Sequence, residues 1–190
     1  MEEPWRPTKQ QLLAANGATV PDLIASHLAV LFCGINPGLY SAAVRHHFAR
    51  PGNRFWPALR ASGFTPRLLS PFEERELLSL GFGITNVVDR ATASADELRK
   101  EEFLAGAKML TSKVKKHRPK VLAVLGVGAY RTAFEKPRAV VGQQEEMIGP
   151  TRLWVLPNPS GLNAHYQADA LAEAFKALRK AATRWDRERS

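Results

Sequence analysis

Two short loops in this chain repeat one pattern of residues, and each could hold an amide side chain at a fixed place. The stretches FCGINPGLYS, residues 32–41, and LPNPSGLNAH, residues 156–165, both contain Asn-Pro followed by Gly-Leu. Proline favours extended geometry in the residue before it, and glycine permits tight or unusual backbone angles. Asn36 and Asn158 should therefore sit in stiff turns. An amide is neither acid nor base near neutral pH, but it can orient a water molecule or a substrate carbonyl.

Each loop also has a structural interpretation. Either asparagine could cap its own backbone, as asparagine does in many turns. The second loop carries Leu162 at its tip, between Gly161 and Asn163. An apolar residue at a loop tip is unfavourable unless it enters something, and in a DNA-binding protein such a residue can enter the base stack. The alternative is that Leu162 packs back onto the last helix.

An aromatic residue stands in a basic, turn-rich stretch between the two loops, HHFARPGNRFW at residues 46–56. Phe48 suits stacking on a base, with Arg50 nearby for a phosphate. The alternative is that Phe48 belongs to the core, which is what we expect of Phe55 and Trp56 at the start of a helix.

Composition favours a polyanionic partner. The 190 residues contain 27 Lys and Arg against 18 Asp and Glu, a net charge of +9 with pI near 10.1. Such an excess attracts nucleic acid, although a basic protein can carry it without that function. The single cysteine, Cys33, excludes an intramolecular disulfide and an iron–sulfur cluster held by this chain's cysteines, and we expect it to be buried. The adjacent His46 and His47 are a poor metal pattern, so we expect no metal.

No apolar run approaches the length of a membrane span, so no membrane partner is expected. The stretch MEEPWRPTKQ lacks the apolar centre of a signal peptide, which favours a cytoplasmic location.

Four short apolar runs predict buried parallel strands at about 28–33, 82–88, 121–125 and 152–156. Helical patterns lie between and after them, at 53–62, 71–80, 94–117, 128–135 and 165–185, and Ser94 with Glu97 forms a capping-box pattern. This order predicts the α/β class: a three-layer α/β/α sandwich around a central, mainly parallel four-stranded sheet. We expect a single domain over 1–190, with an N-terminal helical extension over 1–27 and a C-terminal helix over 165–185. Residues 137–150 could form a hairpin arm or a loop.

Ligands of such sheets bind at the carboxyl ends of the strands. The loops at about 34–54, 89–96, 126–128 and 157–165 should share that edge. The basic run KVKKHRPK, residues 113–120, ends a helix and enters a strand, so we interpret it as a solvated helix terminus at the opposite edge. The better phosphate candidates are Arg45, Arg50, Arg54 and Arg90.

Four motifs in order, GINPGL, HHFARPGNRFW, GITNVVDR and LPNPSGLN, together resemble the mismatch-specific uracil/thymine-DNA glycosylase family of the uracil-DNA glycosylase superfamily. The resemblance runs from about residue 28 to about residue 178. It implies a four-stranded sheet between helices, no metal and no cofactor. It also implies removal of uracil, and in some members of thymine or damaged pyrimidines, from double-stranded DNA, often opposite guanine.

The resemblance assigns roles to individual residues. Asn36 resembles the catalytic asparagine that positions the attacking water. Phe48 resembles the aromatic that stacks on the flipped base, and the backbone amides of Ile35 and Phe48 would bond to the base carbonyls. Asn158 resembles the asparagine that anchors the second loop near the scissile nucleotide. The stretch Gly161, Leu162 and Asn163 resembles the wedge that fills the gap left by the base and contacts the opposite strand. The expected DNA phosphate contacts are Ser41, Arg50, Arg54 and Ser160.

Three positions complicate this assignment. Asp89 also follows a strand at the site edge, and its carboxylate could activate water or stabilise the sugar cation as a second catalytic residue. It could instead pair with Arg90 or cap the next turn. Asn86 stands where some relatives carry lysine, and Asn163-Ala164 replaces a Ser-Arg pair seen in some relatives, which removes an arginine that could hold the opposite guanine.

The predicted function is hydrolysis of the N-glycosidic bond of uracil in double-stranded DNA, with a preference for G·U or G·T mismatches, by base flipping, an asparagine-positioned water and a leucine wedge. We expect a monofunctional enzyme acting as a monomer. One alternative is a nucleotide-binding α/β enzyme, suggested by LGVGAYR at residues 125–131, which lacks the third glycine of the dinucleotide fingerprint. The other is a non-catalytic module that binds mismatched DNA.

Overall fold

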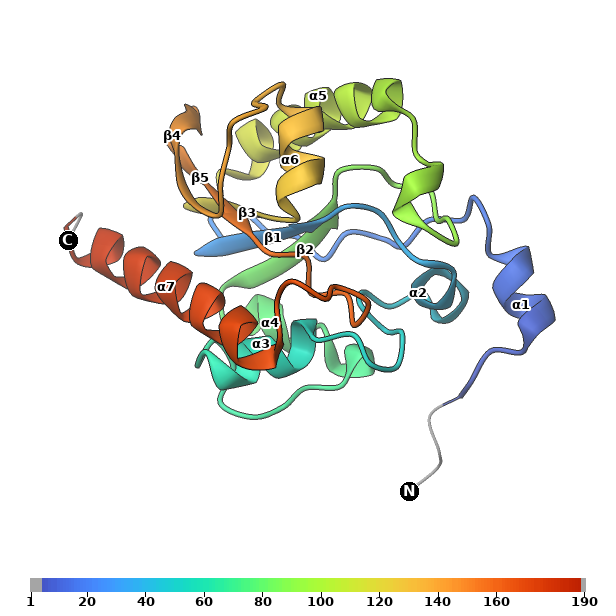
Figure 1. Ribbon diagram of the computed structural model, residues 1–190. Coiled ribbons are helices and arrows are strands. Elements are labelled where there is room, and N and C mark those ends of the chain that lie inside the picture. The colour runs from blue at the N-terminus through green and yellow to red at the C-terminus, as the bar shows by residue number, and fades with distance from the viewer. Residues whose placement is uncertain (1–4, 189–190) are drawn as a thin grey trace.

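The computed structural model describes residues 5–188 and contains a five-stranded sheet in the order β2-β1-β3-β5-β4 (Figure 1). The parallel strands are β1 (Val30–Gly34), β2 (Phe82–Asn86), β3 (Val121–Leu125) and β5 (Thr151–Leu156). They confirm the predicted parallel sheet. The fifth strand, β4 (Gly142–Ile148), pairs antiparallel with β5 at the edge of the sheet. Searching for apolar runs misses β4 because its sequence, GQQEEMI, is mostly polar and only half-buried.

Helices cover both faces of the sheet. Figure 1 shows α5 (Lys100–His117) and α6 (Val127–Ala133) on one face, and α3 (Phe55–Ala61), α4 (Glu76–Ser79) and α7 (Ala168–Arg187) on the other. The α2 helix (Leu39–Val44) follows β1 beyond the end of the sheet.

Two predicted helices differ from the structure. The helix expected over 94–117 is interrupted: the Ser94–Glu97 capping box caps a short 3-10 turn, and α5 begins afterwards, at Lys100. Of the helical extension expected over 1–27, the structure forms only α1 (Lys9–Ala14), and residues 1–4 lie outside the described chain. The stretch from 15 to 27 runs irregularly along the domain and makes a single bridge, Leu23 with Ile84.

The core has two layers, because successive side chains of a strand face opposite sides of the sheet. In β1, Val30 and Phe32 pack toward α3 and α7, whereas Leu31 and Cys33 pack toward α5 and α6. Cys33 is fully buried, and burial raises the pKa of its thiol well above the ordinary range, so the thiol stays protonated and unreactive.

Strand register brings the functional loops together. Gly34 at the end of β1 pairs with Asn86 at the end of β2, and Leu125 at the end of β3 pairs with Leu156 at the end of β5. All four strands therefore finish at one edge, and the loops that follow them are neighbours. The basic run at 113–120 ends α5 and enters β3, so it lies at the opposite edge.

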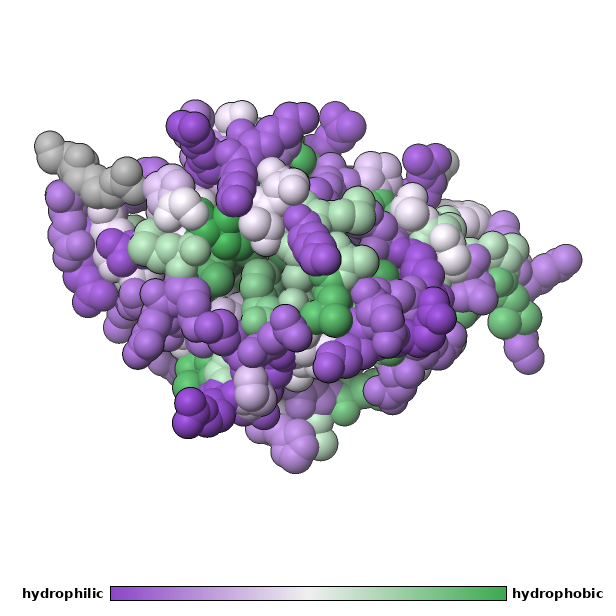
Figure 2. Space-filling model, turned by 90° about the horizontal axis from the view of Figure 1, so that it is seen from above, coloured by the Kyte–Doolittle hydropathy of each residue, from purple (hydrophilic) through white to green (hydrophobic). Residues whose placement is uncertain are grey.

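The surface seen from the side of α5 and α6 is mainly hydrophilic, with a smaller group of apolar side chains near its middle (Figure 2). Within residues 5–188, no helix has both the length and the apolar character needed to cross a membrane.

Candidate active site

A cavity of about 340 Å³ opens at the carboxyl ends of the parallel strands. Its walls come from the loops after β1, β2 and β5 and from the segment between α2 and α3. Asn36 and Asn158 both line it. The two Asn-Pro loops therefore meet in space, as the sequence-based function requires.

The amide of Asn36 is held in one orientation by the loop after β2. Its Nδ2 donates to the carbonyl of Arg90 at 2.9 Å and to Thr92 Oγ1 at 2.8 Å. A carbonyl can only accept, so the amide nitrogen must be the atom that faces Arg90. The Thr92 hydroxyl in turn donates to the carbonyl of Ser94 at 2.7 Å. No donor within residues 5–188 is bonded to Asn36 Oδ1, which leaves this oxygen able to accept a hydrogen bond from water.

The loop after β2 is itself tied to the first Asn-Pro loop. The amide of Val88 donates to Ile35 O at 2.9 Å, and the amide of Thr92 donates to Pro37 O at 3.2 Å. The Arg90 side chain makes two hydrogen bonds to Glu102, at 2.5 and 3.0 Å, and this guanidinium lowers the pKa of Glu102 to about 2. Arg90 therefore stabilises the loop that holds Asn36, and its side chain is not a free phosphate ligand.

Asp89 is not brought to the cavity. It is exposed and borders a separate hollow of about 250 Å³, together with Met109 and Lys113 of α5. The path of the chain explains why Asn86 lines the cavity and Asp89 does not. Asn86 ends β2 beside Gly34, and the residues after it run along α5 until the chain reaches the cavity again at Thr92. Arg90 pairs with Glu102, so the alternative role of Asp89 as its ion-pair partner is wrong.

Phe48 presents an aromatic surface to the cavity. Its ring stacks on Phe55 of the core, with centroids 4.1 Å apart and planes 29° apart, and the half-buried residue also lines the cavity wall. Gly34 makes room for this ring, because a Cβ at that position would lie 3.2 Å from Phe48 and 2.5 Å from Asn86 Oδ1. Phe48 is thus supported by the core on one side and open to a ligand on the other.

Three further polar groups are available at the cavity. Ile35 and Phe48 line it, and their backbone amides have no bonded acceptor within the described residues. Asn86 is buried and lines the cavity, and its side-chain amide makes no hydrogen bond with the described part of the chain. Asn86 has no role among the residues predicted from the sequence. An asparagine inside the apolar run predicted as the strand 82–88 was the signal that could have found it.

The second loop folds on itself. Asn158 Oδ1 accepts from Ser160 N at 3.0 Å, and Asn163 Nδ2 donates to Asn158 O at 3.0 Å. Asn158 therefore caps its own turn, and Asn163 closes it. Leu162 at the tip is 77% exposed, so it does not pack back onto α7.

The Arg54 side chain orders this loop through hydrogen bonds to its carbonyls. Its guanidinium donates to the carbonyls of Gly161 at 3.1 Å, Asn163 at 3.3 Å and Tyr166 at 2.6 Å. Arg54 was predicted as a phosphate contact, but the structure uses its side chain to order the loop. Arg50 is exposed, lines the cavity and makes no side-chain hydrogen bond within residues 5–188, so it is free to bind a phosphate.

The two predicted serine contacts are also loop-ordering residues. Ser41 Oγ accepts from Ala49 N at 3.1 Å, and Ser160 Oγ accepts from Leu162 N at 3.3 Å. Both serines line the cavity, and each hydroxyl keeps a proton to donate.

The cavity contains little charge. Arg50 is the single charged side chain among its lining residues in the described chain, and no carboxylate lines it. Burial lowers the pKa of His47, which also lines the cavity, so this imidazole is neutral near pH 7. No cluster of three or more His, Cys, Asp or Glu residues suited to a metal occurs within residues 5–188. The site can stack a planar ring, bond its polar edge, orient a water molecule and accommodate developing negative charge.

Comparison with known proteins relates the chain to a family. The model of the uracil DNA glycosylase superfamily matches residues 21–182. The fold is similar to the solution NMR structure of a proposed uracil DNA glycosylase from Methanosarcina acetivorans, with a TM-score of 0.59 and 17% sequence identity over 86% of this chain and 98% of that one.

Proposed function

Because the chain belongs to the uracil DNA glycosylase superfamily, we propose that it is a monofunctional DNA glycosylase that removes uracil from double-stranded DNA, with a preference for uracil opposite guanine. The observation that carries the proposal is the fixed Asn36 amide, whose Oδ1 has no bonded donor in the described chain, in the same cavity as the Phe48 ring.

The target bond is inaccessible inside a stacked duplex, so the nucleotide must first leave the helix, which costs a few kcal/mol and less at a mismatch. The flipped base would stack on Phe48. Its carbonyls would accept from the amides of Ile35 and Phe48, and the Asn86 amide would bond to its remaining polar edge.

Cleavage of the C1′–N1 bond leaves its electron pair on the base, which becomes an anion, while the sugar becomes oxocarbenium-like. Hydrogen-bond donors aimed at the base oxygens stabilise that charge as it develops. A water held by Asn36 Oδ1 then adds to C1′ and loses a proton to solvent. The lining residues include no carboxylate that could act as a strong base, so we expect a slow chemical step.

The rest of the site suits the DNA around the base. Leu162 is exposed at the loop tip, where it would fill the space that a flipped nucleotide leaves, and Arg54 orders its loop. Arg50 and the net charge of +9 would attract phosphates, so binding should weaken as salt rises. One copy of the chain supplies all of these groups, which is why we propose a monomer.

The test is a panel of duplexes with uracil, thymine or a damaged pyrimidine opposite each of the four bases, assayed for free base. Release of uracil from G·U DNA by the wild type, and its loss in Asn36→Ala, supports the enzyme. Binding of G·U DNA without base release would support the non-catalytic module. The nucleotide-binding alternative has less in its favour, because the Gly126–Gly128 turn contributes none of the cavity's lining residues in the described chain.

A further inference from the structure

The backbone of the stacking residue has to be imposed by its surroundings. Phe48 has φ 51°, in the left-handed region that an aromatic residue rarely adopts without support. Two side chains from flanking segments and one carbonyl from a more distant segment hold the residues around it. These contacts are Ser41 Oγ with Ala49 N at 3.1 Å, His47 Nε2 with Pro21 O at 2.9 Å, and Trp56 Nε1 with His47 O at 3.2 Å.

The charged member of this support is Glu74. Its Oε2 accepts from the amide of His47 at 2.9 Å, and its Oε1 lies 3.0 Å from Nδ1 of His46. Both histidines directly precede Phe48. Glu74 is 8% exposed, and it is the only buried carboxylate among residues 5–188. Glu74 does not line the cavity, so it can influence a bound base only through the chain that it holds.

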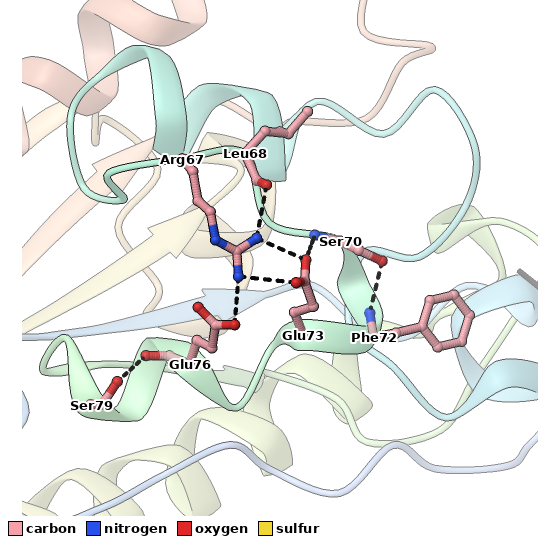
Figure 3. Close-up of polar contacts among 7 residues, drawn as sticks. All are labelled: Arg67, Leu68, Ser70, Phe72, Glu73, Glu76 and Ser79. Atoms are coloured by element: carbon pink, nitrogen blue, oxygen red, sulfur yellow. Dashed lines mark hydrogen bonds and ion pairs between the residues drawn. The ribbon is translucent and has the colours of Figure 1, made fainter. Parts of the chain in front are cut away.

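Residues close to Glu74 in the chain form a clamp of polar contacts across the α3–α4 connection and the start of α4 (Figure 3). Arg67 donates to both carboxylate oxygens of Glu73, at 3.0 and 3.2 Å, and to Glu76 at 2.6 Å. Glu73 also accepts from Ser70 N at 2.8 Å and so caps the 3-10 turn Pro71–Glu73, whose C-cap is Glu74. Exposed ion pairs of this kind add little stability singly, but both acidic partners of Arg67 lie within two positions of Glu74 in the chain.

We propose that Glu74 is a positioning residue that holds His46 and His47 so that the ring of Phe48 faces the cavity. The proposal rests on the function proposed above. It adds that a segment which contributes no lining residue, the α3–α4 connection, controls how well the enzyme stacks on the flipped base.

Single-turnover excision of uracil from G·U DNA tests this role. Loss of a hydrogen bond to a charged group should lower the rate of Glu74→Ala about tenfold or more. Glu74→Gln should keep most of the rate, because its amide can still accept from His47 N and donate to His46. The matched controls are Glu145→Ala and Glu145→Gln, at an exposed carboxylate on β4, and both should behave as the wild type.

A double-mutant cycle separates positioning from general destabilisation. If Glu74 acts through the stacking ring, Glu74→Ala should have no further effect in a Phe48→Ala background. An equal loss in both backgrounds would overturn the proposal. If Glu74→Ala does not fold, as judged by circular dichroism, Glu74→Asp replaces it, because the shorter side chain cannot reach both histidines.

A second readout does not depend on activity. The chain has nine phenylalanines, so the 19F resonance of Phe48 in protein labelled with 4-fluorophenylalanine can be assigned by its absence in Phe48→Leu. This resonance should shift in Glu74→Ala and return toward its wild-type position in Glu74→Gln. A wild type that releases no uracil would reject the proposed function. An active wild type, with an unchanged rate and an unchanged resonance in Glu74→Ala, would reject only the role of Glu74.

Discussion

The two Asn-Pro loops share a sequence pattern but not a way of being held. The Asn36 amide bonds to Arg90 and Thr92, which are 54 and 56 positions away in the chain. The Asn158 amide bonds to Ser160, two positions away. Partners far away in the sequence hold the Asn36 amide through its nitrogen and leave Oδ1 without a bonded donor in the described chain. In contrast, Oδ1 of Asn158 accepts a hydrogen bond within its own turn. The same motif therefore holds an amide with a free oxygen at the cavity in one loop and makes a rigid turn in the other.

The leucines of the two loops differ in the same way. Leu39 packs with Ala15, Val20 and their neighbours, whereas Leu162 is 77% exposed. The first loop is thus anchored through its apolar residue, and the second projects its apolar residue and is anchored from behind by Arg54. Rigidity in one loop and projection in the other suit the water positioning and the wedging that we propose for them.

The largest expected effect tests the asparagines against each other. Asn36→Ala should reduce single-turnover excision of uracil by about 10²–10³-fold, the usual loss when one preorganised polar group is removed from a reaction centre. Asn158→Ala should reduce it by only about tenfold, because it loosens a turn worth about one neutral hydrogen bond. Equal losses would remove the distinction between the loops.

The leucines provide the next test. Leu162→Ala should lower excision about 10- to 100-fold, since a leucine side chain contributes about 1.5–3 kcal/mol when it becomes buried, and the proposed wedge would be buried only in the DNA complex. The thermal midpoint should not change. Leu39→Ala should instead lower the thermal midpoint of unfolding and have little effect on DNA affinity. Fluorescence of 2-aminopurine beside the uracil would show whether Leu162→Ala impairs flipping, and a normal signal would argue against the wedge.

Substitutions of Thr92 test how the Asn36 amide of the first loop is oriented. Thr92→Val keeps the shape but removes one of the two acceptors that orient Asn36, so excision should fall up to about tenfold, the value of one neutral hydrogen bond. Thr92→Ser should retain the wild-type rate because it keeps the hydroxyl. DNA affinity should be the same in all three proteins. A fully active Thr92→Val would mean that Arg90 O alone orients the amide.

The smallest effect is expected at Asp89. Asp89→Ala should change excision by less than about twofold, as is usual for an exposed residue away from the site. The measurement is the same single-turnover assay on G·U DNA. A large loss would instead place Asp89 at the reacting atoms and would require the segment after β2 to move when DNA binds.

Much of this architecture can be predicted from local patterns. The apolar runs predicted four strands, the alternation with helices predicted a parallel sheet, and together these placed Asn36 and Asn158 at one edge. The edge strand β4 could not be found this way, because half of its side chains face solvent and its sequence lacks an apolar run. The 3-10 turn before α5 shows a related limit, since the capping box was evident but the break after it was not.

The residues that complete the site depended on distant contacts. Arg54 could be predicted as a cation at the correct edge, but its bonds to Gly161, Asn163 and Tyr166 span 107 to 112 positions. Asp89 lies three positions after Asn86, yet Asn86 lines the cavity and Asp89 borders only the separate hollow beside α5.

The sequence by itself determined which side chains were available and at which edge of the sheet they lie, because hydrophobic periodicity and turn residues act over a few neighbouring positions. Only the tertiary structure decided which way each polar group faces: Oδ1 of Asn36 toward the cavity, the guanidinium of Arg54 toward a loop, the carboxylate of Glu74 toward two histidines. Hydrogen bonds are directional and join atoms about 3 Å apart, so their partners are set by how remote segments pack and not by the order of residues along the chain.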